Sequence, residues 1–306
     1  MVADDDCQTF CKTDIADAMN QGKILVTGGS GHTGRRLLAR LLERGYAIKA
    51  VTREPVRIPA ELRKRVEVCR GNLDDAVFAA ECMQGCGAVI GMTHIRYADA
   101  ILRAMKSSEV PRGIFMSSTR RFTQFPEETA RQVIAGEEAV RTSGLDFTII
   151  RASMIYGGRQ DRNMQTLLTA LRRWPVHPLV GGGTMKWQPV FTGDVVSAIV
   201  TALERDQTIG KEYTVAGPEP IAYADMVKVI LEEAKLKRIL LPIPFGVAST
   251  AVGLMNRWMK HPPVKPDQIA RLREDKVFDI SDARRDLDFS PMTFREGIQR
   301  KLAGTA

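Results

Sequence analysis

The sequence has few of the residue types from which metal sites are built. It contains four histidines and five cysteines in 306 residues. The pairs Cys7-x3-Cys11 and Cys82-x3-Cys86 lack the two-residue spacing of a zinc knuckle, and Cys69 stands apart from both. No histidine completes a ligand set, so we expect no bound metal.

The N-terminus lacks the features of a secretion signal. Its first residues read Met1-Val-Ala-Asp-Asp-Asp, acidic where a secreted chain is basic and then apolar. All the cysteines fall in the first third of the chain, and their number is odd. We therefore expect reduced thiols and a cytoplasmic location.

Long hydrophobic runs are also missing. The most apolar late stretch, residues 240–259, is interrupted by two prolines, an asparagine and an arginine. A membrane span needs about twenty predominantly apolar residues, so we expect no transmembrane segment. We interpret the stretch as a core helix. A helix lying on a membrane or over a hydrophobic substrate is the alternative, which leaves peripheral membrane contact open.

Aromatic residues are scarce, whereas basic residues are in excess. Aromatics make up 6% of the chain, and the formal net charge is +8. A basic protein favours anionic partners, but single-stranded nucleic acid is bound by aromatic residues interleaved with basic ones. We therefore expect a small-molecule substrate and a phosphorylated cofactor as ligands, and no nucleic acid.

What the sequence does contain is a regular alternation of apolar and amphipathic segments. Six short apolar segments are typical of buried strands, at residues 23–27, 47–52, 66–69, 88–92, 113–117 and 147–151. Helical patterns fall between most of them, at 35–44, 74–83, 97–107 and 128–142. This alternation predicts an α/β fold with a doubly wound parallel sheet of the Rossmann type.

Three parts are expected along the chain. Residues 1–21 form an acidic N-terminal tail, and residues 22–157 form the Rossmann dinucleotide-binding core. Residues 158–306, where the alternation loosens, form a smaller lobe on the substrate side. We expect helices near 194–204, 222–234 and 245–260, and strands of this lobe that return to the core sheet.

The strongest local signal is the glycine-rich loop after the first strand. It reads Thr27-Gly-Gly-Ser-Gly-His-Thr-Gly34 and opens a helix, the context in which such a fingerprint binds a dinucleotide. Gly28 permits the tight turn, Gly31 lets the backbone approach the pyrophosphate, and Gly34 lets the helix pack on the sheet. Backbone N–H groups at the positive end of the helix hold the phosphates. The candidate cofactor residues of the loop are Gly28, Ser30, Gly31, His32, Thr33 and Gly34.

The end of the second strand indicates which nicotinamide cofactor is bound. An NAD site usually has an acidic residue there for the ribose hydroxyls, but this strand ends in Val51-Thr52-Arg53. An arginine at this point suits a 2′-phosphate by charge and by fork geometry. We predict NADP, with Arg53 on its 2′-phosphate; NAD, with Arg53 as a solvated loop charge, is the alternative.

The spacing Gly28-x2-Gly31-x2-Gly34 resembles that of the short-chain dehydrogenase/reductase superfamily. The segment Gly71-Asn-Leu-Asp74 is similar to the family's turn beside the adenine, which implies that Asn72 and Leu73 contact the cofactor. Residues 114–119 resemble the fifth strand, which ends in a catalytic serine or threonine. This resemblance implies a cofactor contact for Ser117 and a catalytic role for Thr119.

Later segments extend the resemblance to residues 22–302. Segments 144–157, 188–194 and 278–283 are similar to those of extended and atypical members, such as the NmrA-like proteins and the nucleotide-binding accessory subunit of complex I. Epimerase/dehydratase relatives share the extended C-terminal half.

The chain departs from the family at the catalytic pair Tyr-x3-Lys. The helix expected to carry it reads Glu127 to Glu137 without a tyrosine or a lysine, and the two positions fall at Thr129 and Val133. Thr119 remains a candidate for binding the substrate carbonyl. Tyr156 or a histidine such as His94 is a candidate displaced acid, and Arg120, Arg121 or Arg131 a candidate source of positive charge. For each, a structural role is the alternative.

Three functions stay open at this point. The first is an NADP(H)-dependent oxidoreductase without the usual tyrosine, acting on a small carbonyl, quinone or enone. The second is a non-catalytic dinucleotide-binding protein, a redox sensor or assembly factor. The third is a relative of nucleotide-sugar epimerases and dehydratases, against which the missing Tyr/Lys pair counts. We expect a monomer or a homodimer.

Overall fold

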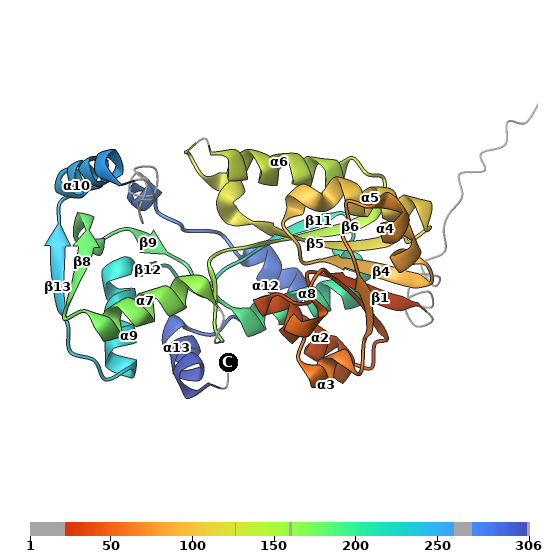
Figure 1. The fold of residues 1–306 in the computed structure, drawn as a ribbon, viewed down its shortest axis with the longest axis horizontal. Helices are drawn as coiled ribbons and strands as arrows, with labels where there is room; N and C mark the ends of the chain where they lie inside the picture. Colours follow the sequence, from red (N-terminus) through yellow and green to blue (C-terminus); the bar gives the residue numbers. More distant parts are fainter. Residues whose placement is uncertain (1–21, 126, 159–160, 260–270, 305–306) are drawn as a thin grey trace, which may run out of the picture.

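The computed structural model describes residues 22–125, 127–158, 161–259 and 271–304. The predicted acidic tail at 1–21, with Cys7 and Cys11, lies outside the described residues. Figure 1 shows a region centred on a sheet and, beside it, a smaller lobe.

The larger region is built on one sheet of seven parallel strands. Their order is β3-β2-β1-β4-β5-β6-β11, so the strand order reverses beside β1. The strands are β1 (Lys23–Thr27), β2 (Ile48–Thr52), β3 (Glu67–Arg70), β4 (Cys86–Gly91), β5 (Arg112–Ser118), β6 (Asp146–Ala152) and β11 (Lys211–Val215). In such sheets the ligand binds outside the carboxyl ends of the strands, where the order reverses.

Helices cover both faces of this sheet. One face carries α2 (His32–Glu43), α8 (Thr192–Glu204) and α12 (Ser281–Leu287). The other carries α4 (Ala76–Met83), α5 (Ala98–Ser107) and α6 (Glu128–Arg141). This two-sided cover confirms the predicted doubly wound fold, and it explains why the strands are continuously apolar.

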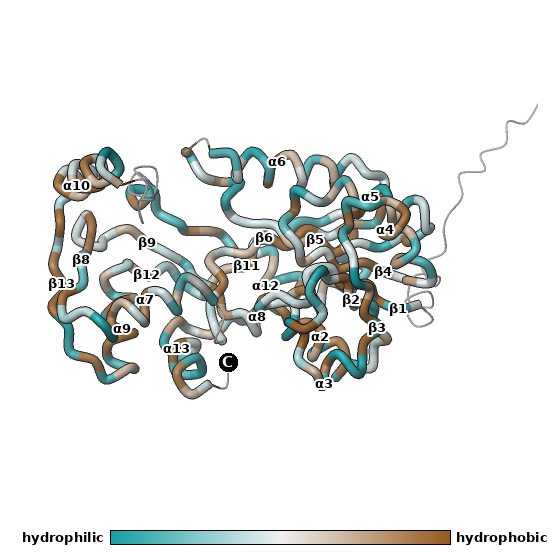
Figure 2. Tube along the Cα trace, in the orientation of Figure 1, coloured by the Kyte–Doolittle hydropathy of each residue, from teal (hydrophilic) through white to brown (hydrophobic). Residues whose placement is uncertain are grey.

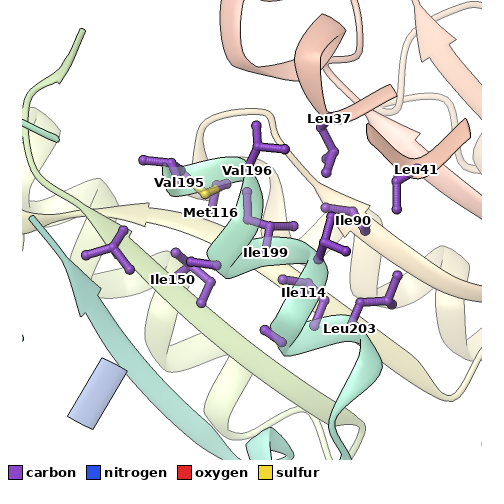
Figure 3. Close-up of a cluster of buried hydrophobic side chains, with 14 of the residues drawn as sticks. Leu37, Leu41, Ile90, Ile114, Met116, Ile150, Val195, Val196, Ile199 and Leu203 are labelled. Carbon is purple, nitrogen blue, oxygen red and sulfur yellow. The ribbon is translucent and has the colours of Figure 1, made fainter. Parts of the chain in front are cut away.

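Neighbouring residues of a strand divide between the two apolar clusters. Ile24 and Val26 belong to the cluster under α2 and α8, whereas Leu25 belongs to the cluster under α4 and α5. Figure 3 shows the first cluster, in which Leu37 of α2 and Ile199 of α8 lie over the strands. These contacts fix α2, and with it the loop before it, on the sheet.

The smaller lobe combines helices with short strand pairs. Its helices are α7 (Arg162–Arg173), α9 (Tyr223–Glu233), α10 (Phe245–Trp258) and α13 (Phe294–Ala303). The pairs are β7 (Ile155–Tyr156) with β10 (Val190–Phe191), β9 (Lys186–Trp187) with β12 (Ile221–Ala222), and β8 (Val176–Val180) with β13 (Ile239–Ile243). A third apolar cluster joins α7, α9 and α13.

Two features of this half differ from the simplest expectation. A strand that the sequence does not predict, β11, pairs with β6 at the edge of the core sheet. The prediction of a core helix within residues 240–259 is wrong. Helix α10 forms there, but Ala248 is its only buried residue. No helix among the described residues is both long and apolar enough to cross a membrane.

Candidate cofactor and substrate site

The glycine loop joins β1 to α2 at the carboxyl edge of the sheet. Gly28 has φ +66°, a conformation that favours glycine, and a Cβ there would lie 3.1 Å from the carbonyl carbon of Met92. A Cβ on Gly34 would lie 2.3 Å from the carbonyl oxygen of Gly28. Side chains at either position would push α2 and β4 away from the loop.

The N-terminus of α2 is open in a way that fits a dinucleotide phosphate. The helix has Gly31 as its N-cap, and no side chain caps its first turn. Gly31 is exposed, so its missing Cβ leaves the amides of the first turn accessible. Unsatisfied N–H groups and the helix dipole attract an anion at this point.

The side chain of His32 lies against Gly158, and that of Thr33 lies beside the start of α8. A Cβ on Gly158 would lie 2.7 Å from the His32 ring, and the Thr33 hydroxyl lies 3.5 Å from that of Thr192. Burial, with the nearby charge of Arg36, lowers the pKa of His32 to about 4. His32 is therefore neutral near pH 7, and the positive character of the loop comes from its backbone.

The end of β2 is tied directly to the loop. The Thr52 hydroxyl donates to the Ser30 hydroxyl at 3.0 Å, which places Ser30 beside the residue that follows, Arg53. Arg53 is exposed and has no ion pair among the described residues, whereas Glu54 is paired with Arg57 at 2.7 Å. An unpaired cation and a hydroxyl therefore share this corner.

Asn72 and Leu73 lie in the turn after β3. The Asn72 side chain donates to Asp74 at 3.0 Å and closes the turn, while Leu73 is buried in the cluster under α4 and α5. The structure thus gives both residues a role in shaping this turn.

Ser117, near the end of β5, faces a buried ionic network. Its hydroxyl donates to Glu137 at 2.5 Å, and Glu137 also accepts from Arg151 at 2.8 Å and from Arg121. Burial opposes ionisation of Glu137, but the hydrogen bonds from Arg151 and Ser117 outweigh it and lower its pKa. Ser117 therefore anchors α6 to the sheet, and Arg121 is committed to the same network.

A cleft of 770 Å³ opens between the carboxyl ends of β5 and β6 and the smaller lobe. Ser118 and Thr119 line it from the sheet, and α7, α9 and β9 line it from the lobe. Much of the wall is apolar, and its apolar side chains include Phe122, Met154, Leu167, Trp187, Leu272 and Phe278. The cleft is on the same edge of the sheet as the glycine loop.

Among the described residues of the cleft, one cation lacks a carboxylate partner. Arg120 is paired with Glu127 at 3.0 Å, and Arg271 with the same carboxylate. Lys276 instead places its ammonium group 4.2 Å from the centre of the Trp187 ring. Burial lowers the pKa of Lys276 from its ordinary value.

Backbone pairing explains why Lys276 lies over Trp187. The Lys276 amide donates to the Lys186 carbonyl at 2.8 Å, and the Lys186 amide donates to Asp275 at 2.7 Å. Two residues further on, the Phe278 amide donates to the buried side chain of Gln188 at 2.8 Å. Sequence reasoning missed Lys276, although it precedes the segment 278–283 that resembles the family.

The displaced acids considered from the sequence lie elsewhere. Tyr156 is buried, donates to the Phe294 carbonyl at 3.3 Å and does not line the cleft; burial raises its pKa. Its environment is that of a core residue, so Tyr156 is not part of the proposed site. His94 caps a short 3-10 turn by accepting from the Arg96 amide at 3.2 Å.

Helix α6 (Glu128–Arg141) carries no tyrosine and no lysine. Thr129 is half-buried, and Val133 is 1% exposed in the apolar cluster under α5. Arg131 is paired with Glu128 at 3.0 Å on the exposed side. The position of Val133 is thus used for packing.

These features define a Rossmann-type dinucleotide-binding protein with a second lobe over its cleft. Residues 28–171 match the NAD(P)H-binding family, so this region is an NAD(P)H-binding domain. The matches agree with the predicted resemblance to atypical and extended members of the short-chain dehydrogenase/reductase superfamily.

Curated relatives include enzymes and a respiratory subunit. The 3 beta-hydroxysteroid dehydrogenase/Delta 5-->4-isomerase of Mycobacterium tuberculosis is 25% identical over 89% of this chain and 86% of its own. The 4-hydroxy-2-methyl-3-oxo-4-farnesyl-3,4-dihydroquinoline-1-oxide ketoreductase of Stigmatella aurantiaca is 23% identical over 76% and 79%. Subunit 9 of the mitochondrial NADH dehydrogenase (ubiquinone) 1 alpha subcomplex of Rattus norvegicus is 32% identical, over 58% of this chain and 47% of the subunit.

Solved structures share the fold. The UDP-glucose 4-epimerase of Thermotoga maritima superposes with a TM-score of 0.72 at 17% identity, covering 92% of this chain and 98% of its own. The dTDP-glucose 4,6-dehydratase DesIV of Streptomyces venezuelae, solved with NAD bound, gives 0.71 at 17% identity, with coverage of 92% and 96%. At this identity the likeness concerns the fold alone.

Proposed function

We propose that the protein is an NADP(H)-dependent reductase of a lipophilic carbonyl compound, a ketone, quinone or enone. The observation that carries this proposal is the cleft of 770 Å³ at the carboxyl edge of the sheet, largely apolar but holding one unpaired ammonium group. An apolar wall with a few placed polar groups is typical of a small-molecule site.

The preference for NADP rests on the corner between the glycine loop and β2. Arg53 is free to bind a 2′-phosphate, and Ser30, held by Thr52, offers a second polar contact. The carboxylate of Glu54 is occupied by Arg57. Because no free carboxylate is held there to accept from ribose hydroxyls, the corner favours a phosphorylated ribose.

When bound, the nicotinamide supplies a hydride to an electron-poor carbon of the substrate. The chain's own residues must then orient the carbonyl and deliver a proton to its oxygen. Thr119 lines the cleft at the end of the sheet, and we propose that its hydroxyl donates a hydrogen bond to that oxygen. Lys276 transfers a proton from Nζ to the oxygen as the alcohol forms, and its amine then regains a proton from water.

The lipophilic substrate class follows from the cleft and from two relatives. The relatives from Mycobacterium and Stigmatella are named for a hydroxysteroid and for a farnesyl-bearing ring ketone. Both compounds are largely apolar with one reacting oxygen. The cleft of this chain resembles that description, because its other charged groups are held by neighbouring protein groups. Arg120 and Arg271 are both paired with Glu127. Glu274 accepts from the Thr123 hydroxyl and the Gln124 amide, and Asp275 accepts from the Lys186 amide.

A second candidate is a non-catalytic NADP(H)-binding protein, and the likeness to the complex I subunit favours it. A nucleotide-sugar epimerase or dehydratase is disfavoured, because that chemistry depends on the Tyr/Lys pair and α6 contains neither residue.

The deciding experiment combines nucleotide binding with turnover. Calorimetry should give tighter binding of NADPH than of NADH, and NADPH oxidation should be followed with steroid ketones, prenylated quinones, enones and keto-sugars. We expect oxidation with the apolar carbonyl compounds and none with the sugars. NADPH binding without turnover on any of them would favour the sensor, and turnover of keto-sugars alone would overturn the proposed substrate class.

A further inference from the structure

The end of the smaller lobe farthest from the seven-stranded sheet is unusually apolar for a surface. It is formed by β8, β13 and α10, which Figure 1 shows together at that end. Figure 2 shows apolar colouring along β13 and on α10. We call this surface the distal face, and it consists of Trp174, Val176, Pro178, Ile239, Leu241, Val247, Leu254 and Trp258.

The strand part of the distal face is one side of the β8–β13 pair. Ile239 pairs with Val176 and Leu241 pairs with Pro178, and all of these side chains are exposed. Ile239 is 65% exposed. The residues between them, His177 and Leu240, are half-buried: His177 lies against Tyr223, and Leu240 packs on the third apolar cluster. The alternation of the strands therefore places the exposed apolar residues on one side.

The helical part is an apolar stripe on α10. Val247, Leu254 and Trp258 follow one another at i, i+7 and i+11, the spacing that places them on one face of a helix. They are 60%, 59% and 77% exposed. The stripe thus lies about 100° around the helix from Ala248, the buried residue of this helix.

Charge distinguishes this surface from an ordinary apolar patch. Segments 171–183 and 234–259 contain no aspartate and no glutamate, although 36 of the 306 residues of the chain are acidic. Their six basic residues are Arg172, Arg173, Lys235, Lys237, Arg238 and Arg257. Five of these are exposed, whereas Arg238 is half-buried and donates to the Leu171 carbonyl.

We propose that the distal face docks on the surface of an anionic lipid bilayer. Exposed apolar side chains enter the boundary between headgroups and acyl chains, while surrounding cations bind the headgroups. Tryptophan, which lies at this depth in membrane proteins, is present at both ends of the face as Trp174 and Trp258. Charge complementarity selects a bilayer over a second copy, because two copies would bring their cations together.

Sedimentation of the full-length protein with vesicles tests the proposal. Vesicles of phosphatidylcholine and phosphatidylserine in equal parts should carry the protein down, whereas pure phosphatidylcholine should carry down at least tenfold less. High salt should release most of the bound protein, because it screens the headgroup contacts. Equal binding to both vesicle types, or to neither, would overturn the proposal.

Two variants separate the apolar and charged contributions. Leu254→Glu with Trp258→Glu, and separately Arg172→Glu with Arg173→Glu, should each lower binding at least roughly tenfold, because each cation near an anionic surface contributes severalfold. Matched controls are Val77→Glu with Ile134→Glu, two exposed apolar residues of α4 and α6, and Arg103→Glu with Lys106→Glu on α5. The controls should bind like the wild type.

The remaining outcomes also decide the question. If the free protein is a dimer that the Leu254→Glu, Trp258→Glu variant dissociates, then a second copy covers the face and the proposal fails. If the controls lose binding as much as the test variants, the attraction is one of net charge and the distal face has no special part in it. The proposal does not depend on the reductase activity, since vesicle binding is measured without cofactor or substrate.

Discussion

The ammonium group of Lys276 lies over the indole ring of Trp187, 4.2 Å from its centre. The contact joins a segment near the C-terminus to β9 at the wall of the cleft. The ring stabilises the cation without accepting a proton from it. A lysine held in this way stays free to interact with a substrate oxygen, and the first prediction tests that role.

Replacing Lys276 should separate proton donation from charge. Lys276→Met is expected to lower kcat by on the order of a hundredfold, the usual size of a lost general acid. Lys276→Arg keeps the charge but does not release a proton near neutral pH, so it should be almost as slow. NADPH affinity should change little in both variants. An arginine variant with full kcat would mean that only the positive charge is used.

The pH profile gives an independent check of this role. The protonated lysine is the donor, so kcat should be constant below the pKa of Lys276 and should fall as pH rises through it. Because burial lowers this pKa, the fall should come below the ordinary value of 10.5. The fall should be absent in Lys276→Met. A profile that keeps the same alkaline fall in this variant would assign the titration to another group.

Cofactor discrimination should depend on Arg53. Arg53→Ala is expected to weaken NADPH binding by roughly tenfold to a hundredfold, the worth of a charge-assisted contact, with NADH almost unchanged. Arg63→Ala, an exposed arginine of α3 (Ala60–Arg63), is the control for the loss of one surface charge. Wild-type protein that binds NADH as tightly as NADPH would contradict the assignment.

The phosphate site can be blocked without disturbing the fold. Gly31→Asp adds a carboxylate at the exposed N-cap of α2, where φ is −72° and a Cβ would lie 3.2 Å from the Gly28 carbonyl oxygen, so the loop must shift slightly to admit it. The melting temperature should change as little as in Gly31→Ala, while calorimetry should detect no NADPH binding. Gly31→Ala should bind more weakly than the wild type. Equal affinity of the aspartate variant would remove the glycine loop from the cofactor site.

The buried carboxylate of Glu137 should matter for stability above all. Glu137→Gln leaves Arg151 and Arg121 without this anion, and the loss of one partner of a buried pair costs about 3 kcal/mol of unfolding free energy. Because the folded-state pKa of Glu137 is lowered, its contribution is present above the ordinary value of 4.5 and is lost as pH falls through the folded-state pKa. Urea titrations should therefore show the largest difference near neutral pH and a smaller one in acid.

The sheet could be predicted from the sequence because its inner strands are covered on both faces and read as apolar runs. The edge strand β11, Lys-Glu-Tyr-Thr-Val, has polar residues on one side and gave no such run. The position of α10 was misjudged because apolar composition does not distinguish a core helix from an exposed one.

Some residues of the candidate site could also be predicted from the sequence, whereas others could not. The glycine loop is local, so its residues and their roles could be proposed from one short segment. Lys276 is held at the cleft by the hydrogen bond that its backbone amide donates to the carbonyl of Lys186, ninety positions earlier in the chain, and no local pattern contains that pairing. Likewise Tyr156 follows β6 as a candidate acid would, but packing against Phe294 turns it into the core.

The last prediction concerns the helix position at which the family carries its lysine. Val133 is 1% exposed and belongs to the cluster under α5. Val133→Lys would place an ammonium group among apolar side chains, which costs several kcal/mol unless the group loses its charge or the helix moves. Restoring the pair as Thr129→Tyr with Val133→Lys should therefore lower stability and add no carbonyl reductase activity. Thr129→Tyr alone should be tolerated, because Thr129 is half-buried. Val133→Met, apolar and of similar length to lysine, controls for size: in urea titrations it should lose much less stability than Val133→Lys. A lysine variant as stable as the wild type, with new activity in the double variant, would show that the helix can still present the pair to the cleft.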